Sequence, residues 1–83
     1  MQSTTAVSIQ CVPVSQAKAG ERGTVVRISG DQGTKKFLSE LGFTAGTEIR
    51  LVSDVKGNKI LNIRGSKIAV DSRMASKIMY CPE

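Results

Sequence analysis

The segment from Leu38 to Gly46, which reads LSELGFTAG, constrains the fold of this chain more than any other stretch. Phe37, Leu38 and Leu41 fall at positions i, i+1 and i+4, so they share one face of a short helix. The sequence therefore predicts a short helix that runs to Leu41.

Gly42 follows at the position where a residue with positive φ ends a helix at little steric cost. If Gly42 is C′, then Leu38 is C3 and Phe43 is C″, and these two positions touch in a Schellman stop. Gly46 then allows the chain to reverse into a strand over 47–52. The segment carries no catalytic group, so we expect it to organise a small barrel or to present a surface.

Short apolar and β-branched runs make the remainder mainly β. About five strands are predicted, over 24–29, 47–52, 60–63, 67–70 and 78–80, with a short edge strand over 9–12. In so small a domain, open strand edges invite aggregation, and curling into a partly closed barrel removes them. We expect a small SH3-like barrel with one short inserted α-helix and one or two helical turns. It forms a single domain over 9–83, after a loose segment over 1–8.

Four local features are predicted within this barrel. Val26 and Ile28 should face the core, with Arg27 facing out. Thr34 should cap the inserted helix, and Asp71 should cap a single helical turn that ends at Ala75. Gly65-Ser66 fits a two-residue hairpin loop with glycine first, which is the type II′ preference.

The composition argues against catalysis. The chain has 83 residues and contains no His and no Trp, and its aromatic residues are two Phe and one Tyr. Without His it lacks the usual general base near neutral pH and the commonest metal ligand. No nucleophile–base pair, phosphate loop or pair of acids stands out. We therefore expect no enzymatic activity. The net charge of +5 is spread along the chain.

The two cysteines, Cys11 and Cys81, lie near opposite ends of the sequence and form no CxxC motif. The N-terminus lacks the pattern of a signal peptide, and no run approaches the ~20 apolar residues that span a bilayer. These observations predict a cytosolic protein with both thiols reduced. A disulfide or a two-thiol metal contact between the two cysteines remains an alternative.

Four motifs occur in order along the chain: Gly23-Thr24-Val25-Val26, Leu38-x-x-Leu41-Gly42-Phe43-x-x-Gly46-Thr47, Arg64-Gly65 and Ala75-x-x-Ile78. Together they resemble the FeoA family, the small cytosolic accessory proteins of bacterial ferrous iron transport. The resemblance covers residues 14–80. Two departures are visible, namely Ala45 where the family often has Pro, and a short turn over 56–58 where many members carry a longer loop.

The resemblance implies an SH3-like barrel that acts with FeoB, a membrane transporter with a cytosolic GTP-binding domain. The predicted function is a non-catalytic accessory or regulatory role, in which the chain docks on the cytosolic part of this transporter. The candidate partner-binding residues are Leu38, Leu41, Gly42, Phe43, Gly46, Arg50 and Lys59. For Phe43 two roles stay open, a surface anchor for a partner and the latch of the Schellman stop.

Two other functions are weighed against docking. The family is also associated with transition metals, and Cys11 with Cys81 is the only pair in the sequence that suggests a weak Fe(II) or Zn(II) site. No cofactor is required. A small basic barrel can also bind nucleic acid, but such surfaces stack bases on exposed aromatic residues, and few are available here. The protein is expected in the cytoplasm or at the inner membrane through its partner, as a monomer or a weak homo-oligomer.

Overall fold

Six antiparallel strands form one sheet in the computed structural model, which describes residues 10–83. The strand order is β1-β6-β2-β3-β4-β5. The strands are β1 (Val12–Pro13), β2 (Arg22–Ile28), β3 (Glu48–Val55), β4 (Asn58–Ile63), β5 (Ser66–Val70) and β6 (Ile78–Pro82), and the helices are the 3₁₀ helix η2 (Val14–Gln16), α1 (Gln32–Glu40) and α2 (Ser72–Ala75). None of the helices in the described residues has the length and apolar character needed to cross a bilayer.

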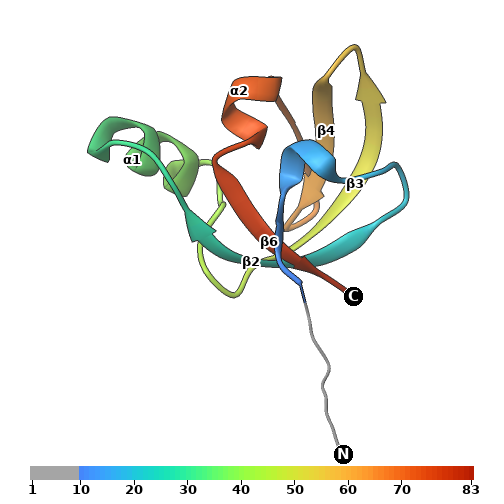
Figure 1. The fold of residues 1–83 in the computed structure, drawn as a ribbon, viewed down its shortest axis with the longest axis horizontal. Coiled ribbons are helices and arrows are strands. Elements are labelled where there is room, and N and C mark those ends of the chain that lie inside the picture. Colours follow the sequence, from blue (N-terminus) through green and yellow to red (C-terminus); the bar gives the residue numbers. More distant parts are fainter. Residues whose placement is uncertain (1–9) are drawn as a thin grey trace, which may run out of the picture.

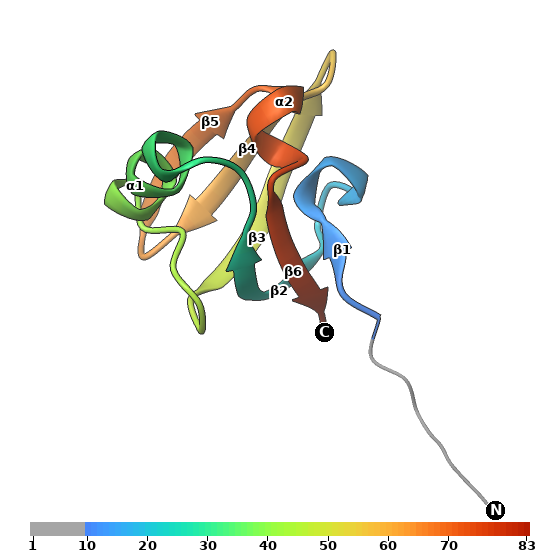
Figure 2. The same cartoon turned by 60° about the vertical axis from the view of Figure 1, so that its left-hand side comes forward.

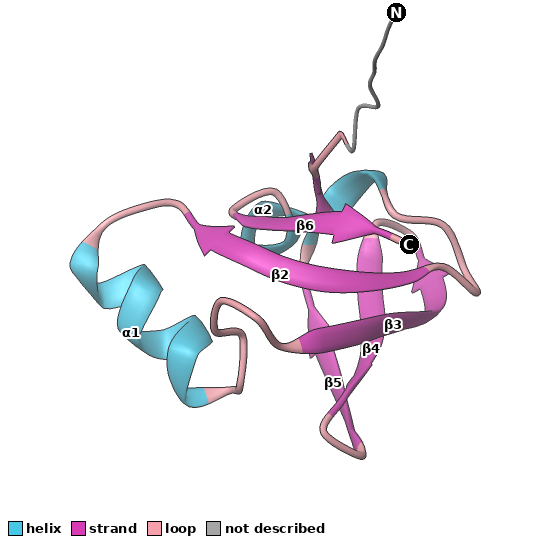
Figure 3. Cartoon of the chain, turned by 90° about the horizontal axis from the view of Figure 1, so that it is seen from below, coloured by secondary structure: helices cyan, strands magenta, loops and turns pink. Residues whose placement is uncertain are grey.

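The sheet is strongly curled. Figure 3 shows β2 and β6 running across the direction of β4 and β5, so that the two halves of the sheet enclose a common interior. The helix α1 lies at one end of the molecule (Figure 1), whereas α2 packs against β4, β5 and η2 (Figure 2). This arrangement confirms the predicted mainly β, SH3-like architecture. The predicted loose segment over 1–8 and residue 9 of the predicted edge strand lie outside the described residues, so the domain limits stay a prediction.

The interior of the curled sheet is filled by side chains from every part of the fold. The nine largest fully buried side chains are Tyr80, Phe43, Leu38, Leu51, Leu61, Ile63, Ile78, Val14 and Val25. Leu38 is the only buried residue of α1. The helix therefore depends on Leu38 and on its own C-terminal stop to hold it against the sheet.

The C-terminus of α1 has the geometry predicted from the sequence. The Phe43 N–H donates to the Leu38 carbonyl at 3.0 Å, and the Gly42 N–H donates to the Ser39 carbonyl at 3.0 Å. These are the two hydrogen bonds of a Schellman motif, and Gly42 has the required positive φ of 109°. Leu38 is buried and Leu41 packs against the core, whereas the Phe37 side chain is 49% exposed.

The two helix N-termini are both capped by aspartate. Asp31 Oδ1 accepts from the Thr34 N–H at 2.8 Å, and Asp71 Oδ1 accepts from the Met74 N–H at 2.8 Å. The Asp71 prediction is confirmed. The Thr34 prediction is wrong, because the helix begins at Gln32 and Thr34 supplies the capped N–H instead of the capping oxygen. An aspartate is a somewhat stronger N-cap than a threonine, which favours the earlier start.

Irregularities in two strands decide which valines face outward. The pairing of β2 with β6 shifts between Val25 and Arg27, and the pairing of β3 with β4 shifts between Leu51 and Ser53. A bulge adds one unpaired residue and changes the alternation of faces. Val26 and Val52 are the residues left unpaired at these two shifts, and they are 42% and 39% exposed, whereas Val25 is buried. The prediction that Val26 faces the core is wrong for this reason.

Both tight hairpins place two consecutive residues in the left-handed region. Lys56 and Gly57 have φ of 53° and 86°, and Arg64 and Gly65 have φ of 52° and 81°. Positive φ at both central residues is the mark of a type I′ turn. The predicted loop at Gly65-Ser66 is therefore displaced by one residue, because β5 already begins at Ser66.

Candidate docking surface

The predicted partner-binding residues divide into buried and exposed groups. Leu38 and Phe43 are fully buried and Lys59 is 5% exposed. Leu41 and Gly42 are partly buried, whereas Gly46 and Arg50 are exposed. Because Phe43 is 0% exposed, its side chain offers no surface to a partner, and the structure gives it the role of the helix latch.

Lys59 ties two parts of the fold together. Its Nζ donates to Asp54 Oδ2 at 2.6 Å and to the Ala17 carbonyl at 3.2 Å. Lys59, Leu61 and Ile63 occupy every second position along β4. The Lys59 side chain therefore points inward, on the same face as the two buried apolar side chains. The buried cation therefore joins the β3–β4 hairpin to the segment that follows η2, and the expectation that it lies on the docking surface does not hold.

The Asp54–Lys59 pair makes stability depend on pH. The hydrogen bond from Lys59 holds the pKa of Asp54 below its usual value of 3.8, against a smaller opposing effect of desolvation. Because the pKa of Asp54 is lower in the folded state than in the unfolded state, its carboxylate stabilises the fold at pH values above the unfolded-state pKa. This contribution is lost as pH falls through the folded-state pKa. We expect Asp54→Asn to lower Tm at pH 7, with the difference from wild type shrinking as pH falls below 3.8 and vanishing once pH is below the lower pKa that Asp54 has in the folded state.

Thermal melts followed by circular dichroism between pH 7 and pH 2 test this expectation. Glu40→Gln is the matched control, since it removes an exposed carboxylate on α1, away from the Lys59 pair. A constant Tm difference between Asp54→Asn and wild type over the whole range would contradict the argument.

On the exposed side, the turn between α1 and β3 forms a hollow of about 490 Å³, here named the corner hollow. It is lined by Thr44, Ala45, Gly46, Thr47, Glu48 and Arg64. The Gly46 N–H donates to the Val25 carbonyl at 2.7 Å, and the Val25 N–H donates to the Thr47 carbonyl at 2.8 Å. The Thr44 and Thr47 hydroxyls are also hydrogen-bonded, at 2.8 Å. The turn is therefore fixed to β2 before any partner binds.

A second hollow of about 330 Å³, here named the outer hollow, lies on the outer face of β2, β3 and β4. Arg22, Arg50, Asn62, Glu48 and Glu83 supply its polar lining. Glu48 lines both hollows, so the two lie next to each other. Of these lining residues, the sequence predicted only Arg50 as a partner-binding residue. Arg22 and Asn62 lie beside Arg50 because their strands pair with β3, and their spacing along the chain does not reveal this pairing.

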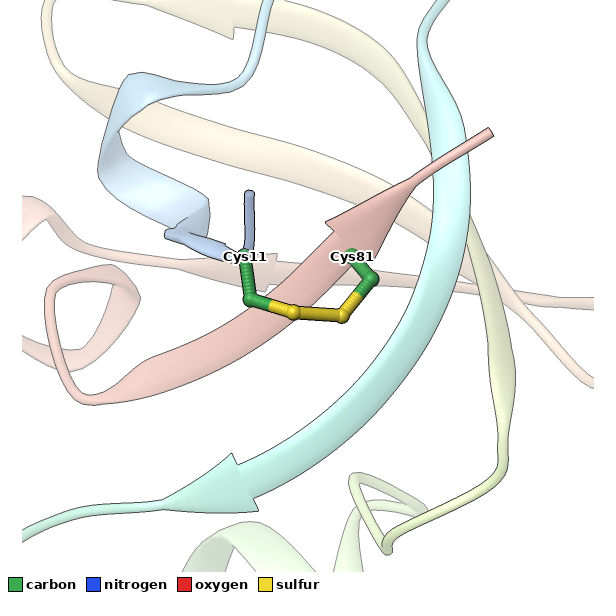
Figure 4. The surroundings of a disulfide bond; sticks show 2 residues. All are labelled: Cys11 and Cys81. Carbon is green, nitrogen blue, oxygen red and sulfur yellow. A yellow bond between two sulfur atoms is a disulfide. The ribbon is translucent and has the colours of Figure 1, made fainter. Parts of the chain in front are cut away.

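Cys11 and Cys81 form a disulfide, which Figure 4 shows. The pairing of Val12 with Tyr80 places the preceding and the following cysteine opposite each other, with their Cα atoms 4.1 Å apart. The prediction of two reduced thiols is wrong for this structure. Since the thiolate is the form of cysteine that binds metal, neither bonded sulfur can act as the predicted ligand. Within residues 10–83 no group of three or more His, Cys, Asp or Glu is placed to hold a metal ion.

Comparison with known proteins identifies relatives along most of the chain. A family model described as the FeoA domain matches residues 12–80. A protein of Methanocaldococcus jannaschii, named "Putative Fe(2+) transport protein A", is 31% identical over 67 residues, which cover 81% of this chain and 82% of that protein.

Solved structures show the same fold. The crystal structure of an iron uptake regulatory protein (FeoA) is similar with a TM-score of 0.84 and 27% identity, over 89% of this chain and 99% of that one. A manganese-dependent transcriptional repressor reaches a TM-score of 0.83 at 19% identity, over 93% of this chain and 44% of the repressor. The repressor shares the fold alone. The ordered motifs, the family model and the relative at 31% identity agree, and the chain belongs to the FeoA family.

Proposed function

We propose that this chain is a non-catalytic accessory protein of ferrous iron uptake, which docks on the cytosolic part of an FeoB-type GTP-binding membrane transporter. The observation that carries the proposal is the family membership over residues 12–80. The relative in Methanocaldococcus jannaschii is named for Fe(2+) transport, and the similar crystal structure is titled an iron uptake regulatory protein.

The exposed surface supports docking. The corner hollow and the outer hollow lie next to each other, and the turn that lines the corner hollow is hydrogen-bonded to β2. A surface already held in one shape loses less conformational entropy when a partner binds. The chain has no His to act as a general base there. These features suit recognition of another protein.

The proposal is tested by capture of the transporter. The immobilised chain is exposed to detergent-solubilised membranes from the source cells, and the retained proteins are identified by mass spectrometry. We expect recovery of an FeoB-type transporter at an ionic strength near 0.15 M, where charges more than about 8 Å apart are largely screened. Recovery of ribosomal or RNA-bound proteins in its place, lost on nuclease treatment, would overturn the proposal.

Two variants localise the contact. Ala45→Arg adds a long side chain to the exposed rim of the corner hollow, whereas Ala19→Arg adds the same side chain to an exposed loop that lines neither hollow. We expect Ala45→Arg to weaken binding by about tenfold, or ~1.4 kcal/mol, while Ala19→Arg binds like wild type. Equal binding by both variants would exclude the corner hollow from the contact.

The disulfide bears on the proposed cytoplasmic location. Reducing systems in the cytosol keep most thiols reduced, whereas Cys11 and Cys81 are bonded in the structure. Growing cells are quenched with acid and the protein is alkylated with N-ethylmaleimide. A mass that carries two adducts without prior reduction would agree with a cytoplasmic location, whereas two adducts that appear only after reduction would contradict it.

A further inference from the structure

Two arginines face each other across neighbouring strands in the outer hollow. Arg22 on β2 is the register partner of Arg50 on β3, and both are exposed. The Leu51 N–H donates to the Glu21 carbonyl at 2.7 Å. Hydrogen-bonded and non-hydrogen-bonded pairs alternate along an antiparallel ladder, so the adjacent Arg22–Arg50 pair is non-hydrogen-bonded, and in such pairs the side chains lie closest. Like charges directly opposite each other destabilise a sheet. The stability of the sheet therefore does not account for this pair.

The row of polar groups continues across the sheet. Arg50 is paired with Asn62 on β4, and Asn62 is paired with Lys67 on β5. Glu83 offsets part of the positive charge, with its Oε1 3.6 Å from Nε of Arg22, but the two side chains are 51% and 71% exposed. An ion pair this exposed is weak. A carboxylate from another molecule can therefore displace Glu83 from Arg22.

We propose that the outer hollow binds a segment of a protein partner that carries a single acidic side chain, with its carboxylate held between the guanidinium groups of Arg22 and Arg50. Arginine presents its donors in a planar fork that matches a carboxylate. The side-chain amide of Asn62 adds a donor for a carbonyl oxygen of the same segment. The inference rests on the proposed docking function only for the identity of the partner.

The same hollow is poorly suited to nucleic acid. Glu48 and Glu83 flank the arginines, so a dense row of phosphates would meet two negative charges, whereas a single carboxylate set between the arginines avoids them. Binding of single-stranded nucleic acid also relies on exposed aromatic residues for base stacking. Phe43 and Tyr80 are buried, and the exposed Phe37 does not line the hollow.

An NMR titration tests the site without the transporter. The ¹⁵N-labelled chain is titrated with the peptide acetyl-Gly-Gly-Glu-Gly-Gly-amide and with the same peptide carrying Gln for Glu. We expect the Glu peptide to shift the side-chain N–H signals of Arg22, Arg50 and Asn62, with a Kd in the millimolar range or tighter. The Gln peptide should leave them unchanged, and Arg22→Gln/Arg50→Gln should abolish the response. Absent shifts, or shifts centred elsewhere, would overturn the proposal.

A second measurement uses the transporter. Arg22→Gln/Arg50→Gln is compared with Lys35→Gln/Lys36→Gln, which removes the same charge from exposed positions on α1. We expect the first variant to bind solubilised transporter at least about tenfold more weakly and the second to bind like wild type, with neither variant lowering Tm. An equal loss for both variants would overturn the site while the docking function stands. If the wild-type chain itself does not bind the transporter, the docking function fails, and the peptide titration alone decides the site.

Discussion

Phe43→Ala is expected to remove a large share of the stability of this domain. The side chain is 0% exposed and closes the stop at the end of α1. Truncating a buried Phe costs about 3–5 kcal/mol, because the transfer free energy is lost and a cavity remains. A chain of 83 residues has a total free energy of unfolding of roughly 4–12 kcal/mol, at about 0.05–0.15 kcal/mol per residue. Much of the population should therefore unfold under mild denaturing conditions.

Urea denaturation followed by circular dichroism measures this loss. Phe37→Ala is the matched control, since the same truncation is made on a side chain that is 49% exposed on α1, where surface substitutions usually stay within about 0.5 kcal/mol. If Phe43→Ala were no more destabilising than Phe37→Ala, the burial of Phe43 and its role as a latch would both be refuted. Because Phe43→Ala is expected to destabilise the fold, docking is better tested with surface variants.

Gly23→Ala is expected to have the second large effect. A Cβ at Gly23 would overlap the backbone carbonyl oxygen of Cys81 and would lie 2.7 Å from Cδ2 of Tyr80. Gly23 is paired with Pro82 across β2 and β6. Because a backbone carbonyl cannot rotate away as a side chain does, the two strands have to separate. We expect a loss of about 3 kcal/mol, at or above the upper end of the usual range for overpacking.

Gly33→Ala is the control for this substitution. It lies in the first turn of α1, and its Cβ would make only an ordinary contact, at 3.6 Å from Asp31 Oδ1. Replacing glycine with alanine inside a helix stabilises by about 0.5–1 kcal/mol. The two substitutions should therefore shift the urea midpoint in opposite directions. A Gly23→Ala protein as stable as wild type would show that β2 and β6 are not in close contact.

The features predicted correctly from the sequence depend on neighbouring residues. The stop at Gly42 is specified by Leu38, Ser39 and Phe43, all within five residues, and the cap at Asp71 acts on a residue three positions later. Such hydrogen bonds form within one short segment, so their sequence signatures are sufficient. The mainly β fold followed in the same way from short β-branched runs and glycine turns.

Three of the errors arise where the environment comes from distant strands. Val26 turns outward because the pairing of β2 with β6 contains a bulge. Lys59 is buried because the carbonyl of Ala17, 42 residues away, accepts from its Nζ. Cys11 and Cys81 meet because β1 and β6 are neighbours, across a separation of 70 residues.

The candidate site likewise contains features that follow from local sequence and features that depend on distant strands. The sequence by itself determined the turn around Gly46 and the family to which the chain belongs, since both are written in contiguous motifs. Only the tertiary structure decided that Arg22 stands opposite Arg50 and beside Asn62, because strand register brings together side chains that are far apart in the chain. A slip of one residue between β2 and β3 would turn Arg22 or Arg50 to the other face of the sheet, and because α1 separates these strands in the chain, no hairpin turn fixes their register.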